Sequence, residues 1–165
     1  MPSYDATSAR CAVFTFKEGL LSAVAHDLEL EVGRFTVEVS DDGASIRARF
    51  EAGSLRVVEP IVDGRRAPGT LSDKDKRKIE ENLRDDVLHA KRHPEIVFES
   101  TEVTDTRVVG RLTMNGATRE VRCTRDGERA SATLHQPDWG IKPYSAMLGT
   151  LKIKPDVRVE LALTR

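Results

Sequence analysis

The sequence predicts an all-β fold, an antiparallel barrel with one accessory α-helix. Apolar and polar residues alternate with period two through most of the chain, which is the pattern of strands with one buried face. These runs are short and are joined by turn residues such as Asp41-Asp42-Gly43. Closing about eight such strands into a barrel removes the exposed edges of the sheet and leaves an interior wide enough for one elongated small ligand.

The composition is that of an ordinary globular domain. The chain has 165 residues, of which 39% are apolar and 32% charged, so residues 1–165 are expected to form a single domain. A formal net charge of −1 provides no general attraction to nucleic acid. The sequence contains no apolar run of the roughly 18 residues that span a bilayer and no signal peptide. We therefore expect a cytoplasmic protein with no nucleic-acid partner and no integral membrane contact.

The alternation places the strands along the chain. Gly33 shifts its phase, as expected for a bend in a barrel strand. In the run before this glycine, Leu28 and Leu30 share the apolar face, and Glu29 and Glu31 share the other. The expected strands are Arg10–Lys17, Val24–Val32, Phe35–Val39, Ile46–Glu51, Ser54–Glu59, Ile96–Thr104, Arg107–Met114, Ala117–Arg125, Arg129–Gln136, and Thr150–Leu163 with a break near Pro155.

One hairpin has a predictable register. Asn115-Gly116 between two β runs is typical of a two-residue type I′ turn. This turn pairs Met114 with Ala117 and Leu112 with Arg119. Cross-strand partners lie on the same face of a sheet, so Arg119 is expected to face inward among apolar residues.

The single helix is expected at about residues 73–90. Ser72 is followed three residues later by Asp75, which is typical of a helix N-terminus. Ile79, Leu83 and Val87 recur every four residues and form a narrow apolar stripe. Pro94 prevents a longer helix.

Four segments of the chain form a pattern that is specific when they are taken together. They are Ala25-His26-Asp27-Leu28-Glu29-Leu30 with Gly33-Arg34-Phe35, residues 88–101 including His93-Pro94-Glu95-Ile96-Val97-Phe98-Glu99-Ser100-Thr101, residues 110–119 including Leu112-Thr113-Met114-Asn115-Gly116-Ala117-Thr118, and Asp138-Trp139-Gly140-Ile141. In order and spacing these segments resemble the YceI-like family, the polyisoprenoid-binding, lipocalin-like barrel proteins. The resemblance implies an eight-stranded lipocalin-like barrel, often dimeric, that encloses a polyisoprenoid, a quinone precursor or a fatty amide. A homodimer is expected only through this resemblance.

The inner face of the barrel supplies the candidate ligand-binding residues. Its apolar members either fill the interior as an ordinary core or line a cavity, and the sequence leaves both interpretations open. The connection Asp138–Gly149 is expected to act as a lid, a wall or a plug through its aromatic and apolar residues. The expected apolar members are Phe14, Phe16, Leu28, Phe98, Leu112, Met114 and Leu134, with Trp139, Tyr144 and Met147 from the connection.

Two polar residues share the inner face. His26 precedes Leu28 on the apolar side of its strand, where it either binds a ligand head group or makes a local hydrogen bond at a barrel end. Arg119 lies near its turn, where it either pairs with an anionic group of a ligand or is a rim charge that reaches water.

The residues give little indication of catalysis or metal binding. His26 and Asp27 are adjacent in a strand and therefore point to opposite faces. His89 and His93 are four residues apart, but Pro94 disrupts the helix there and no third ligand is nearby. Cys11 and Cys123 are expected to be free thiols. We expect a binding protein without cofactor or metal; the alternatives are a hydrolase or isomerase with His26 as base and Arg119 stabilising an anion, and a ligand-free stress-related interaction module.

Overall fold

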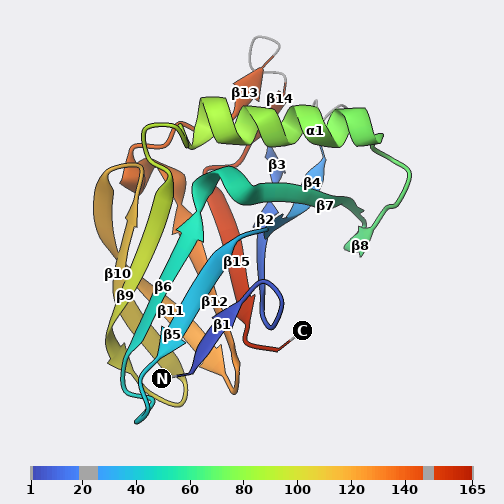
Figure 1. The fold of residues 1–165 in the computed structure, drawn as a ribbon. Coiled ribbons are helices and arrows are strands. Elements are labelled where there is room, and N and C mark those ends of the chain that lie inside the picture. The colour runs from blue at the N-terminus through green and yellow to red at the C-terminus, as the bar shows by residue number, and fades with distance from the viewer. Residues whose placement is uncertain (1, 19–25, 147–150, 165) are drawn as a thin grey trace.

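The computed structural model describes residues 2–18, 26–146 and 151–164. Within these ranges the chain forms a twelve-stranded main sheet that curls around an apolar interior, a three-stranded sheet, and the helix α1 (Asp73–Asn82), which lies across one end of the curled sheet (Figure 1). All paired neighbours are antiparallel, so the prediction of an all-β, lipocalin-like fold is confirmed.

The strand order shows how the sheet curls. The small sheet consists of β13 (Ser145–Ala146), β14 (Leu151–Ile153) and β3 (Lys17–Glu18), in that order. In the main sheet the spatial order is β1 (Ser3–Asp5), β5 (Phe35–Val39), β6 (Ile46–Glu51), β9 (Glu95–Val103), β10 (Arg107–Met114), β11 (Ala117–Asp126), β12 (Arg129–His135), β15 (Asp156–Ala162), β2 (Arg10–Thr15), β4 (Asp27–Val32), β7 (Leu55–Val62) and β8 (Arg65–Arg66).

The expected number of eight strands is wrong, chiefly because two long strands are bent. β4 continues into β5 through Gly33, and β6 continues into β7 through the 3-10 turn η2 (Ala52–Ser54). The bends are side by side, since the Gly33 N–H donates to the Ser54 carbonyl at 2.9 Å. A Cβ on Gly33 would lie 2.9 Å from that same oxygen, so the close approach requires glycine. The short edge strands β1 and β8 account for the rest of the difference.

The helix begins as predicted and ends slightly early. Ser72 and Asp75 form a reciprocal capping box, in which the Asp75 N–H donates to Ser72 Oγ at 3.1 Å. The helix continues through a π-helical turn, η3 (Leu83–Val87), and not to residue 90. His89 has a φ of 49°, a left-handed conformation that turns the chain away from the helix.

The predicted hairpin register is confirmed. Met114 pairs with Ala117 and Leu112 with Arg119, and Asn115 and Gly116 both have the positive φ of a type I′ turn, 53° and 76°.

One end of the barrel is packed with side chains, and the other end contains a cavity. The end away from α1 is packed by a cluster that includes Cys11, Phe35, Val37 and Ala48. A second cluster lies toward α1 and includes Leu112, Met114, Leu134 and Trp139. Phe98 packs against both clusters. The barrel is therefore filled at one end and hollow at the other, beneath α1.

Replacing Gly110 with alanine should destabilise the barrel. A Cβ there would lie 2.4 Å from Phe98 Cζ and 2.5 Å from the Glu99 carbonyl oxygen, which is fixed in the sheet. Such overpacking costs typically about 1–3 kcal/mol, measurable by chemical denaturation. Gly53→Ala is the matched control, because its nearest contacts would be an ordinary 3.7 Å. A Gly110→Ala protein that unfolds at the wild-type denaturant concentration would contradict this packing.

Candidate functional site

A cavity of about 300 Å³ lies beneath α1, against the inner face of the sheet. This volume is at the lower end of the range of roughly 300–1,000 Å³ that is usual for small-molecule sites. The lining is almost entirely apolar: Cys11, Val13, Leu28, Leu30, Val32, Phe50, Ala52, Leu55, Leu71, Ile79, Leu83, Val87, Leu88, Ile96, Leu112, Met114, Leu134, Ile141, Ile153, Val157 and Val159. The polar side chains that line it are Thr15, His26, Glu51, Asn82, Gln136 and Tyr144.

The strand register explains why these residues form one wall. Val13 of β2 pairs with Val159 of β15 on one side and with Leu30 of β4 on the other. One step closer to α1, Thr15 pairs with Leu28. Because every second residue of a strand faces the same side, each strand contributes alternate residues to the wall.

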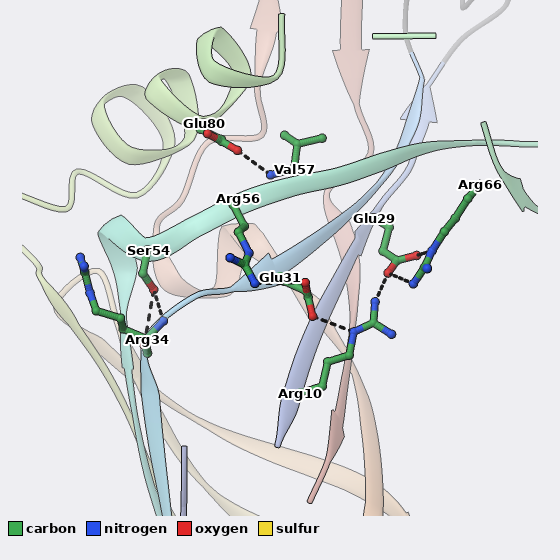
Figure 2. A network of polar contacts seen from close by, with 9 residues as sticks. All are labelled: Arg10, Glu29, Glu31, Arg34, Ser54, Arg56, Val57, Arg66 and Glu80. Carbon is green, nitrogen blue, oxygen red and sulfur yellow. Dashed lines mark hydrogen bonds and ion pairs between the residues drawn. The ribbon is translucent and has the colours of Figure 1, made fainter. Parts of the chain in front are cut away.

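The helix α1 forms a lid over one side of the cavity. Ile79, Leu83 and Val87 all line the cavity, so the predicted apolar stripe does face inward. Two polar contacts hold α1 to β7: the Val57 N–H donates to Glu80 Oε2 at 2.8 Å, and Lys76 Nζ lies 2.9 Å from Glu59 Oε1. Figure 2 shows Glu80 reaching down from α1 to Val57.

Replacing Glu80 with alanine should loosen this lid. Val57 is buried, so the change leaves a buried backbone N–H without its acceptor, at a cost of about 1–3 kcal/mol. Glu80→Gln keeps an acceptor oxygen and should cost less. We expect lower stability for Glu80→Ala by thermal denaturation and faster release of bound ligand by stopped flow. Equal behaviour of the alanine and glutamine proteins would show that this contact does not hold the lid.

About half of the predicted site residues line the cavity. These are His26, Leu28, Leu112, Met114, Leu134 and Tyr144. The residues that do not are Phe14, Phe16, Phe98, Arg119 and Trp139, while Met147 lies outside the described residues.

The inward orientation predicted for Phe14 is wrong, and Phe16 lies outside the lining as well. Val13 and Thr15 face the cavity, so Phe14 faces outward, where it pairs with Glu29 and Arg158. The alternation did not distinguish the two faces of β2, because both are apolar. Phe16 follows the end of β2.

Three other expected members of the site lie elsewhere. Phe98 is inside the barrel, but it packs over Gly110 between the two core clusters. Arg119 is exposed and donates to the Thr118 carbonyl at 2.9 Å, as expected of a rim charge. Trp139 is 3% exposed and donates its ring N–H to the Leu112 carbonyl at 3.0 Å, so it plugs the barrel wall.

The cavity lining also includes residues that the sequence did not predict, from the helix, from β2 and from the segment after β12. With Phe14 expected to face inward, its neighbour Val13 would face outward, whereas the structure places Val13 in the cavity wall. Thr15 is 7% exposed, and its hydroxyl is a buried polar atom without a hydrogen-bond partner in the described structure. Gln136 is 8% exposed and donates from Nε2 to the Lys154 carbonyl at 3.3 Å.

The ionisable groups in and near the cavity include the Cys11 thiol and the Asp27 carboxylate. Burial, and secondarily the charge of Glu31, raises the pKa of the Cys11 thiol to about 12, so this thiol is protonated at neutral pH. Cys11 and Cys123 are both free, as expected. The Asp27 carboxylate accepts from the Lys17 N–H at 2.7 Å. Within the described ranges we find no group of three or more His, Cys, Asp or Glu residues arranged to hold a metal, and no helix able to cross a membrane.

An ion-pair network supports the cavity wall from outside (Figure 2). Glu29 is 3% exposed and accepts from Arg66 at 2.7 and 2.8 Å and also from Arg10. Arg10 also binds Glu31 at 2.8 Å, and Arg56 lies 3.5 Å from Glu31. The hydrogen bond from Arg66 is the main cause of a lowered pKa for Glu29. These contacts tie β2, β4, β7 and β8 together behind the wall.

Comparison with known proteins identifies the family. The sequence profile of the YceI-like domain matches residues 4–165. The chain belongs to the YceI-like family. This YceI-like protein is similar in fold to a solved polyisoprenoid binding domain from Saccharophagus degradans, described as implicated in plant cell wall breakdown. The TM-score is 0.59 at 12% sequence identity, with 96% of this chain and 94% of that chain covered. No curated protein matches this YceI-like chain.

Proposed function

We propose that this protein binds one elongated apolar ligand inside the barrel, and thereby sequesters or carries it. The observation that carries the proposal is the apolar cavity that lies between the sheet and α1. The candidate ligands are a polyisoprenoid, a quinone precursor or a fatty amide, and the polyisoprenoid class is supported by the description of the similar solved domain. The proposal includes no chemical step and no cofactor.

Burial of a sufficiently long apolar chain offsets the free-energy cost of association. Each enclosed methylene contributes about 0.8 kcal/mol, so ten methylenes contribute roughly 8 kcal/mol. This is of the same order as the cost of association, about 4–15 kcal/mol. A ligand with a longer buried chain is therefore bound with useful affinity although the lining supplies few polar contacts.

Mass spectrometry of an organic extract tests the proposal. Protein purified without detergent is denatured in chloroform and methanol, and we expect one class of long apolar compound in an amount comparable to the protein. The cavity-filled variant Val13→Trp, extracted identically, should yield much less of it. An empty wild-type extract, together with no uptake of an added long-chain alcohol, would refute the proposal.

A further inference from the structure

The binding of a purely apolar ligand gives no role to the buried hydroxyl of Thr15. Its side chain lines the cavity, is 93% buried, and has no hydrogen-bond partner within the described structure. Burying a hydroxyl without a partner is unfavourable, and a valine of nearly the same shape would avoid this cost. The hydroxyl is therefore expected to have a partner when the cavity is occupied.

Thr15 lies near His26, the only histidine among the described residues that line the cavity. Thr15 of β2 pairs with Leu28 of β4, and His26 lies two residues before Leu28 and lines the same cavity. None of the hydrogen bonds identified among the described residues uses the His26 ring. Three other polar side chains of the lining each make one hydrogen bond within the protein: Gln136 donates to the Lys154 carbonyl, and Asn82 donates to the Tyr144 hydroxyl at 3.2 Å. Thr15 and His26 thus form a polar corner with free hydrogen-bonding capacity.

The charge of the lining restricts what this corner can bind. Lys and Arg are absent from the described residues that line the cavity, and the segments 19–25 and 147–150 contain no charged residue. The one carboxylate, that of Glu51, is exposed and paired with Arg34 at 2.5 Å. An anionic group inside the cavity would lose its hydration without gaining a cation. Lys17 and Lys152 are exposed on the small sheet, outside the lining.

We propose that the ligand carries an uncharged oxygen-bearing group, such as a hydroxyl, carbonyl or amide, which hydrogen-bonds to Thr15 and His26 inside the cavity. This inference rests on the proposed function and adds the chemical class of the polar group. Thr15 supplies both a donor and an acceptor, and the His26 ring supplies at least one N–H donor, so the corner accommodates a hydroxyl, a carbonyl or an amide oxygen. A diphosphate head, by contrast, belongs outside the cavity.

Three probes with the same chain but different heads test this inference. Farnesene, farnesol and farnesyl diphosphate are titrated into delipidated wild-type protein and into Thr15→Val and Thr15→Ser. The wild type should bind farnesol about tenfold more tightly than farnesene and more tightly than the diphosphate. Thr15→Val should remove most of this preference without weakening the binding of farnesene. Thr15→Ser should retain the preference, because it retains the hydroxyl.

The outcomes separate the two proposals. Three results would overturn the proposal of an uncharged head group bound at Thr15: equal binding of farnesol and farnesene by the wild type, tightest binding of the diphosphate, or an undiminished preference for farnesol in Thr15→Val. Each of them would leave the proposal of apolar ligand binding intact. Failure of all three probes to bind the wild type would overturn carriage itself. Thr15→Val should unfold at the same or a higher denaturant concentration than the wild type, so a loss of the preference would not reflect misfolding.

Discussion

Val13→Trp should weaken the binding of geranylgeraniol by about fiftyfold or more. Val13 lies in the middle of the cavity wall, between Val159 and Leu30. An indole there occupies space that otherwise holds several ligand carbons. Displacing three methylenes costs roughly 2.4 kcal/mol, which corresponds to about sixtyfold in affinity. Isothermal titration calorimetry of delipidated protein measures this change.

The control for this variant is Val62→Trp, which adds the same side chain at a position 43% exposed on the outer part of β7. It should bind geranylgeraniol as the wild type does. The Val13→Trp protein should remain folded, because the added volume enters an existing cavity and not a packed core. Wild-type affinity in Val13→Trp would mean that the ligand does not occupy this cavity.

Arg10→Ala combined with Arg66→Ala should lower the free energy of unfolding by about 3 kcal/mol at pH 7. The double change leaves the carboxylate of Glu29, whose side chain is 5% exposed, without either of its cations. Removing the partners of a buried charge typically costs about 3–5 kcal/mol. We expect the lower end, because the two arginine side chains are 34% and 50% exposed and their charges are partly screened. Urea denaturation measures the loss.

The contribution of Glu29 to the pH dependence of stability should have opposite signs in the wild type and in the Arg10→Ala, Arg66→Ala double variant. In the wild type the pKa of Glu29 lies below its ordinary value of 4.5, mainly because of the Arg66 hydrogen bond. The stabilisation is therefore complete above about pH 4.5 and is lost as the pH falls through the lowered pKa. In the double variant burial is expected to raise the pKa of Glu29. Mild acid then protonates this carboxylate, and the loss of unfolding free energy relative to the wild type should become smaller. Adding Glu29→Gln to the double variant should recover part of the stability at pH 7. If it recovers none, the unpaired carboxylate of Glu29 is not the cause of the lost stability.

The fold could be predicted where local rules determine it. The register of the β10–β11 hairpin follows from Asn115-Gly116, and the start of α1 follows from Ser72 and Asp75. The bend at Gly33 was expected from the shift in alternation, but its pairing with the second bend was not, because the contact joins Gly33 to the Ser54 carbonyl, distant in sequence. Alternation also did not orient β2, where Phe14 and Val13 are equally apolar.

The site was less predictable than the fold because its features depend on distant partners. Leu28, Leu112 and Leu134 were assigned to the interior because their alternation is clear. The missing partner of Thr15 is a property of the packed structure and has no sequence signature. The same holds for the Glu29–Arg66 contact, which joins residues 37 positions apart.

The dependence of affinity on chain length tests the central claim of a hollow barrel most directly. Geraniol, farnesol and geranylgeraniol share one head group and differ by one prenyl unit at each step. Calorimetric titration of the delipidated protein should give one site per chain and an affinity that rises by at least about tenfold per added unit until the cavity is full. An affinity that does not change with chain length, or no saturable binding of any of the three, would contradict the account.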